Sequence, residues 1–90
     1  VTYDVSDVKR LRKMYGQMRR FGEHVQYSVF LCDLSVSEYE RLLSDLEVLI
    51  HHGEDRVLIA DLGPTDGRGM SAVHQMGRGD IPGCLDALIM

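Results

Sequence analysis

Two carboxylates stand close together near the start of the chain, in the stretch "VTYDVSD". Asp4 follows residues of high strand propensity, whereas Asp7 precedes a helix-like pattern. Carboxylate oxygens are hard ligands of the kind that Mg²⁺ prefers, and a protein often supplies only one or two of them. A bound metal ion can activate water and stabilise charge on a phosphate. Asp4 is therefore a candidate metal ligand, and a solvated strand end is the plainer alternative.

The chemistry of Asp4 would require two chains. One carboxylate in each chain is a poor metal site, but a twofold axis repeats the same residue on both sides of an interface. Two copies of Asp4 that meet across such an axis would form a plausible site. Asp7 has a competing structural role, because a carboxylate in the first turn interacts favourably with the helix dipole. Ser6 competes with Asp7 for the helix cap and is also a possible phosphate hydrogen-bond donor.

Basic residues are concentrated in the segment that follows, although the net charge of the chain is −4. Residues 1–30 contain six basic and three acidic residues, whereas residues 31–62 contain two basic and eight acidic residues. With about 100° between successive helical residues, the basic side chains project away from the apolar stripe. They are Lys9, Arg10, Arg12, Lys13, Arg19 and Arg20. A solvated helix face is the ordinary explanation, but one basic face on an acidic protein favours nucleic-acid binding that weakens with salt.

Two amphipathic helices are predicted to position these residues. Apolar residues recur at three- and four-residue spacing across residues 8–21, and Gly22 is a typical stop. A second apolar stripe follows Ser35, which forms a capping-box pattern with Glu38. Gly53 is predicted to close that second helix.

The remaining segments predict strands around these helices. The stretch "HVQYSVFLCDL" is long enough for two short strands with a bulged or bent connection, and "DRVLIADL" for a strand covered on at least one face. "MSAVHQMG" predicts one more strand. The order indicates an α+β, ferredoxin-like βαββαβ sandwich with helices on one face and an additional C-terminal strand. We expect residues 1–76 to form this core with its extra strand and residues 77–90 to form a C-terminal tail that could dock on a partner subunit.

Length and composition exclude several classes of protein. A 90-residue chain buries a limited core, so pairing with a second copy would be a natural way to bury more surface. No apolar stretch approaches the ~18 residues of a membrane span, and no signal-peptide pattern is visible. Cys32 and Cys84 lack the spacing of a zinc site or disulfide framework and are typical of reduced intracellular thiols. These features favour a cytoplasmic protein without a membrane partner.

Several stretches together resemble the Cas2 family of CRISPR-associated proteins, the small nuclease-like component of spacer acquisition. They are "YDVSD", "KRLRK", "VQYSVFLCDLS" and "EDRVLIADLG", and the similarity extends over about residues 1–76. The resemblance implies a ferredoxin-like fold and a homodimer whose sheets face each other, with a C-terminal strand that commonly reaches the partner's sheet. It also implies Mg²⁺, or another divalent metal, and cleavage of RNA or DNA phosphodiesters.

The resemblance also assigns roles to individual residues. It makes Asp4, from both protomers, the metal ligand and catalytic residue. Arg10 and Arg12 match the paired basic positions of the family's first helix, while His24 stands where many members carry arginine. The matching "QYSVF" run contains Gln26, Tyr27, Ser28 and Phe30.

The hydroxyl groups of Tyr27 and Ser28 are further catalytic candidates. Ser28 could donate a hydrogen bond to a phosphate near the metal, whereas Phe30 is expected to pack in the core. Three functions remain open from the sequence. The chain could be a metal-dependent endonuclease, acting on single-stranded RNA, duplex DNA or both as a dimer with the CRISPR integrase subunit. It could instead be a non-catalytic adaptor that bridges integrase dimers and binds prespacer DNA, or a regulatory module that binds no nucleic acid.

Overall fold

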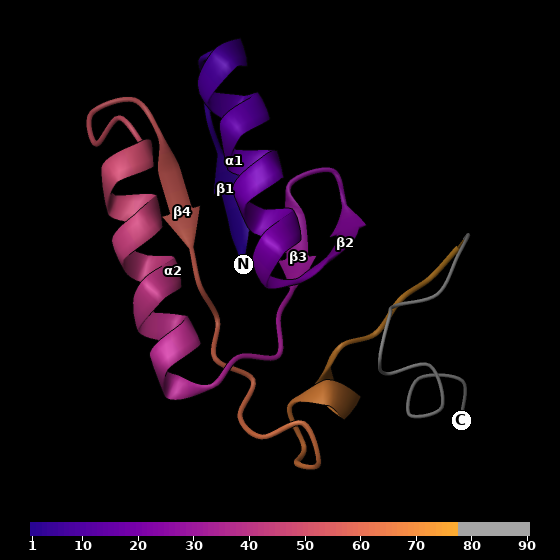
Figure 1. Cartoon of the computed structure of the whole chain (residues 1–90). Helices are drawn as coiled ribbons and strands as arrows, with labels where there is room; N and C mark the ends of the chain where they lie inside the picture. The colour runs from indigo at the N-terminus through magenta and orange to yellow at the C-terminus, as the bar shows by residue number, and fades with distance from the viewer. Residues whose placement is uncertain (78–90) are drawn as a thin grey trace. The chain divides into compact units, whose positions relative to one another are not determined.

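The computed structural model describes residues 1–77. These residues belong to two compact units, Val1–Ile59 and a second unit that begins at Ala60. The first unit contains two helices and the strands around them (Figure 1). In chain order its elements are β1 (Thr2–Asp4), α1 (Val8–Phe21), β2 (Glu23–Gln26), β3 (Val29–Leu31), α2 (Val36–Leu49) and β4 (Arg56–Leu58). The expected βαββαβ order is present.

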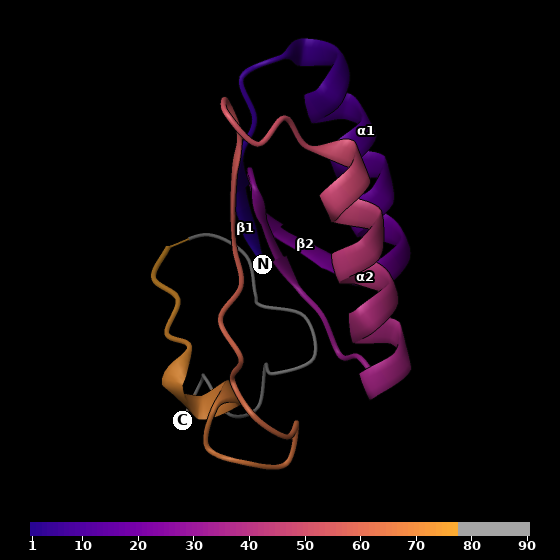
Figure 2. The ribbon, with the colours of Figure 1, turned by 90° about the vertical axis from the view of Figure 1, so that its left-hand side faces the viewer.

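The four strands of the first unit form one antiparallel sheet in the order β2-β3-β1-β4. Each strand–helix–strand segment therefore joins two parallel strands that a third strand separates, which is the split arrangement of the ferredoxin-like fold. Both helices cover the same face of the sheet (Figure 2). Gln17 of α1 donates a hydrogen bond to Asp45 of α2, with 2.6 Å between Nε2 and Oδ2. The predicted α+β, ferredoxin-like class is confirmed.

The core lies between the helices and the covered face of the sheet. The repeating periods of strand and helix explain which residues the core contains, because residues two apart in a strand and four apart in a helix share a face. Its buried residues are Tyr3, Val5, Met14, Met18, Phe30, Leu42 and Leu46. The prediction that Phe30 packs in the core is confirmed. The other face of the sheet carries none of these side chains.

Side-chain caps begin both helices. The carboxylate of Asp7 accepts a hydrogen bond from the backbone N–H of Arg10 at 2.9 Å, so Asp7 and not Ser6 caps α1. Ser35 and Glu38 form the predicted capping box at the start of α2. Neither helix, nor any other in residues 1–77, has the length and apolar character needed to cross a bilayer.

Gly22 ends α1 and leads directly into β2. Its backbone is extended, with φ of −162°, so no left-handed conformation calls for glycine here. A Cβ atom would instead collide with the carbonyl oxygen of Leu31 and the Sγ of Cys32. The close approach of the helix end to β3 therefore requires glycine.

The β2–β3 hairpin confirms the prediction of two short strands with an irregular connection. Tyr27 and Ser28 form its turn, and the register shifts between His24 and Gln26. In residues 1–77 no residue other than glycine has positive φ, so this turn is not of the mirror-image type that two-residue hairpins favour. The bulge accommodates that difference in twist.

The strand expected over "DRVLIADL" is shorter than predicted. β4 ends at Leu58, because its partner β1 offers only Thr2 to Asp4 for pairing. The apolar residues that follow have no neighbouring strand in the first unit with which to continue the ladder. The length of a strand depends on its partner as much as on its own composition.

The prediction of an additional C-terminal strand at residues 70–77 is wrong. Met70–Ala72 is a short 3₁₀ helix, η1, and residues 73–77 form no strand. The N–H of Ala72 donates to the carbonyls of Arg68 and Gly69, at 3.2 and 3.1 Å. These local bonds satisfy backbone groups that a strand would pair with a neighbour. Nearly all of the tail expected at residues 77–90 lies outside the described residues, so its boundary and docking stay predictions.

Candidate functional site

Asp4 lies on the open face of the sheet, at the end of the central strand β1. Its neighbours Tyr3 and Val5 are buried on the helix side, so the alternation of a strand directs Asp4 the other way. Its side chain is exposed, and its carboxylate forms no hydrogen bond or ion pair with any other residue of 1–77. Arg56, the first residue of β4, is its cross-strand neighbour. Asp4 is thus accessible, with a cation beside it on the same face.

One chain supplies only part of a metal site at this position. The Asp4 carboxylate has the donor chemistry that Mg²⁺ prefers. Within residues 1–77, however, no group of three or more His, Cys, Asp or Glu side chains gathers to hold an ion. The residues present therefore offer the type of ligand that a magnesium ion prefers. They offer enough ligands only if another copy of the chain contributes its own.

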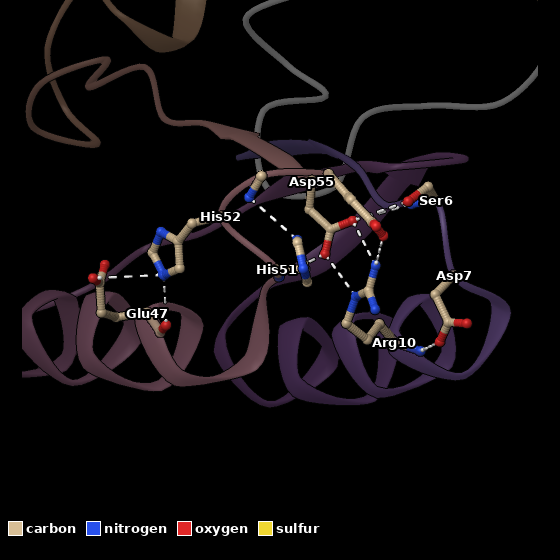
Figure 3. Close-up of polar contacts among 9 residues, drawn as sticks. Ser6, Asp7, Arg10, Glu47, His51, His52 and Asp55 are labelled. Carbon is tan, nitrogen blue, oxygen red and sulfur yellow. Dashed lines mark hydrogen bonds and ion pairs between the residues drawn. The ribbon is translucent and has the colours of Figure 1, made fainter.

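Arg10 is held in a cluster of ion pairs at the start of α1 (Figure 3). Its Nε lies 2.8 Å from Oδ2 of Asp55, and its Nη2 lies 3.1 Å from Oε1 of Glu54. Both acids belong to the loop between α2 and β4. The sequence grouped Arg10 with the nucleic-acid-binding residues, and its charge is already matched by two acids of this loop.

Asp55 is the centre of this cluster. Its carboxylate also accepts hydrogen bonds from the backbone N–H groups of His51, at 2.8 Å, and of Ser6, at 3.2 Å. Its side chain has no exposed area. The hydrogen bond from Arg10, followed by those from the two backbone N–H groups, holds the pKa of Asp55 well below its usual range despite the opposing effect of desolvation. Asp55 thereby ties three segments together: the β1–α1 loop, α1 and the end of α2.

The other basic residues of α1 remain exposed. Lys9, Arg12, Lys13, Arg19 and Arg20 form no ion pair with any other residue of 1–77. The Arg19 guanidinium lies over the ring of Tyr15, with its Cζ 5.9 Å from the ring centroid. The predicted basic face therefore exists, but Arg10 does not add a free charge to it because Arg10 is paired with Asp55 and Glu54.

Arg12 borders a cavity of about 360 Å³ between α1 and the β2–β3 hairpin. This cavity, which we call the hairpin cavity, is lined by Tyr3, Leu11, Arg12, Tyr15, His24, Tyr27 and Ser28. The fold thus brings together three residues named from the sequence, Arg12, Tyr27 and Ser28. Asp4 is not part of this lining, because it projects from the opposite face of the sheet.

Comparison with known proteins identifies the family. The sequence profile described as "CRISPR associated protein Cas2" matches residues 1–68. The chain belongs to the Cas2 family. "CRISPR-associated endoribonuclease Cas2 1" of Rhodospirillum rubrum is 40% identical over 78 residues, which are 87% of this chain and 76% of that protein. "CRISPR-associated endoribonuclease Cas2" of Geobacter sulfurreducens is 36% identical over 66 residues, 73% of this chain and 70% of the relative. "CRISPR-associated endoribonuclease Cas2 2" of Thermodesulfovibrio yellowstonii is 42% identical over 62 residues, 69% and 68% of the two chains.

The matched region of the Cas2 profile includes the whole first unit and therefore every residue named from the sequence as a site candidate. The resemblance to this family, expected from the four stretches quoted above, is confirmed. The roles of Asp4, Tyr27, Ser28 and the basic residues stay predictions, because their positions alone do not establish what they bind.

Sequence reasoning missed Arg56 and the packing of His24 in this Cas2-family fold. Arg56 lies opposite Asp4 because the first and last strands pair, a signal that the βαββαβ order already contained. His24 lies opposite Phe30 in the hairpin, and its ring packs between Phe30 and Tyr15, with centroids 5.1 and 5.2 Å away. Its place on the helix side follows from the core position of Phe30, once the register is known.

Proposed function

We propose that this Cas2-family chain is a metal-dependent endonuclease that hydrolyses phosphodiester bonds of single-stranded RNA, duplex DNA or both during spacer acquisition. Asp4 from two copies would hold the Mg²⁺ ion. The observation that carries this proposal is the carboxylate of Asp4 at the end of the central strand, which is exposed and has no polar partner within residues 1–77. The names of the relatives, which describe them as endoribonucleases, support the hydrolytic activity.

The open face of the sheet supports the requirement for a second copy. Leu58 lies on this face close to Asp4 and is 57% exposed, so a homodimer that buries the face would remove apolar surface from water. A twofold axis through that interface would repeat Asp4 and supply the second carboxylate. The two Asp4 carboxylates would hold a magnesium ion, which when bound would lower the pKa of water and stabilise charge on a phosphate. Arg56, the cross-strand neighbour of Asp4, would contact a phosphate oxygen.

One observation favours a second candidate, the non-catalytic adaptor. The exposed basic residues belong to α1 in the helix layer, whereas Asp4 projects from the opposite side of the sheet. A nucleic acid held by α1 of one chain would therefore not reach Asp4 of that chain directly. In this alternative the dimer binds prespacer DNA through the α1 faces and bridges dimers of the CRISPR integrase subunit, and Asp4 has no catalytic role.

Cleavage assays with two aspartate variants distinguish these candidates. Wild type, Asp4→Asn and Asp33→Asn are incubated with single-stranded RNA and with duplex DNA, each with Mg²⁺ and with a chelator. Asp33 is an exposed aspartate outside the proposed site and provides the matched control. We expect Asp33→Asn to cleave like the wild type, whereas Asp4→Asn and the chelated samples fall to background.

The oligomeric state of each sample is measured by light scattering, and its affinity for each nucleic acid by fluorescence anisotropy. A retained dimer and retained affinity in Asp4→Asn would assign the loss of cleavage to the chemistry. Equal residual cleavage by wild type and Asp4→Asn would indicate a contaminant and favour the adaptor. Failure of the wild type to bind either nucleic acid would contradict both candidates.

A further inference from the structure

The hairpin cavity has a lining that the proposed metal chemistry does not use. Its volume of about 360 Å³ lies within the range of sites for small organic groups. The aromatic residues Tyr3, Tyr15, His24 and Tyr27 make up much of its wall, and no acidic residue of the described part of the chain lines it. The cavity therefore offers flat apolar surfaces and a cation, a combination that suits a planar ring attached to a negative charge.

The ring of Tyr27 is 92% exposed even though it belongs to the cavity wall. Its backbone is nevertheless fixed, because its carbonyl oxygen lies 3.1 Å from Nε2 of His24 and the flanking residues Gln26 and Val29 pair in the hairpin. An exposed aromatic ring on a fixed backbone loses little conformational entropy when another ring stacks on it. Such rings are the stacking platforms of proteins that bind single-stranded nucleic acids.

Arg12 provides the charge that this ligand would need. Unlike Arg10, it forms no ion pair with another residue of 1–77, so its guanidinium remains available. Ser28 adds a hydroxyl group at the same cavity, and its backbone carbonyl already accepts a hydrogen bond from the N–H of Tyr3 at 3.1 Å. Guanidinium and hydroxyl groups both donate hydrogen bonds to phosphate oxygens.

We propose that the hairpin cavity holds one unstacked base of a single-stranded nucleic acid, with the base on Tyr27 and the adjacent phosphate on Arg12. Bases within a duplex are already stacked on one another, so this site selects single strands. The inference rests on the proposed function in that it takes a nucleic acid as the ligand. It deepens that function by assigning the residues that contact one base and its phosphate, and it requires no cleavage.

Binding of the full chain to an intact and an abasic strand tests the base directly. The probes are a short fluorescent oligouridine and a strand of the same length that lacks all its bases, in metal-free buffer at fixed salt. Both strands present the same backbone charge, so only the base contact differs. We expect the intact strand to bind roughly 5- to 150-fold more tightly, as one stacked base requires.

Tyrosine variants test whether Tyr27 causes the preference for the intact strand over the abasic strand. Tyr27→Ala is expected to remove the difference between intact and abasic strands, and Tyr27→Phe to retain it, because stacking requires the ring and not the hydroxyl. Tyr39→Ala removes a partly exposed tyrosine of α2, outside the cavity, and serves as the matched control. Since Tyr27 is exposed, these variants should keep the wild-type thermal transition, which circular dichroism checks.

Equal affinity of the wild type for intact and abasic strands would overturn the proposal. A Tyr27→Ala variant that weakens both strands by the same factor would also overturn it, because the ring would then act on the backbone or on the fold. Failure of the proposed function is distinguishable: cleavage independent of Asp4, together with a Tyr27-dependent preference for intact strands, would contradict the nuclease and support the cavity. Cleavage that requires Asp4, without any preference for intact strands, would support the nuclease and contradict the base-binding role of the cavity.

Discussion

Arg10 and Arg12 belong to the same turn of α1 but lie in different surroundings. Arg10 is ion-paired with Asp55 and Glu54, from the loop that joins α2 to β4. Among residues 1–77 Arg12 has no such partner, and it borders the hairpin cavity instead. With about 100° between successive residues, two positions along a helix separate two side chains by about 200°. Residues that share an outward face in a sequence pattern can therefore contact different parts of the fold.

This difference separates structural from binding roles. The Arg10 cluster stabilises the connection between distant segments, and its cation is already matched by anions. Arg12 is an exposed cation near aromatic rings, so a ligand can use its charge without breaking an internal contact. Only the second arrangement is suited to a polyanion, although the family resemblance placed both arginines in the same motif.

Neutralising each arginine should give the largest contrast in stability. Arg10→Gln leaves the unexposed Asp55 carboxylate without its charged partner, so we expect a clear fall in melting temperature. Arg12→Gln should change the free energy of unfolding by less than about 0.5 kcal/mol, as is usual for exposed positions. For a domain of this size that corresponds to roughly 2–4 °C. Differential scanning calorimetry of both variants measures the contrast, and equal melting temperatures would contradict it.

Acid should weaken the Arg10 cluster in a predictable direction. The pKa of Asp55 is lower in the folded chain than in the unfolded chain, so the unfolded state binds the proton first. The stabilisation is therefore complete above the unfolded pKa of about 4 and is lost as pH falls below it toward the folded pKa. We expect the free energy of unfolding, measured with urea, to fall between about pH 5 and pH 2.

Two variants show which carboxylates cause this pH dependence of the free energy of unfolding. Asp55→Asn should flatten most of it, because asparagine does not titrate. Glu38→Gln should remove a smaller part, since the backbone and hydroxyl of Ser35 also lower the pKa of Glu38. An unchanged slope in Asp55→Asn would mean that other carboxylates account for the acid sensitivity.

The local elements were largely predictable from the sequence. Asp7, Ser35 and Gly22 mark helix ends through contacts within a few residues or through small size, and the apolar periods identify the buried helix faces. The exposed end of β1 at Asp4 followed in the same way. The prediction of a strand at residues 70–77 was wrong because hydrogen bonds within residues 68–73 outweighed β propensity.

The contacts that separate the two arginines could not be predicted from the sequence. The Arg10–Asp55 pair joins residues 45 positions apart and depends on where the α2–β4 loop lies relative to the first turn of α1. The hairpin cavity depends on the bulge in β2, which sets the positions of His24 and Tyr27 relative to α1. Composition and periodicity specify elements, whereas these contacts depend on register and on loop paths.

The smallest expected effect is on the salt dependence of binding to single-stranded RNA. If Arg12 contacts a phosphate, Arg12→Gln should reduce the slope of log K against log salt concentration by about 0.7, the value for one contact to a single strand. Arg10→Gln should leave the slope nearly unchanged, because its charge is already paired with Asp55 and Glu54. Fluorescence anisotropy at several salt concentrations measures both slopes at a temperature where both variants are folded. Equal reductions would mean that the Arg10 cluster opens on binding, and the division between a structural and a binding arginine would then not hold in the complex.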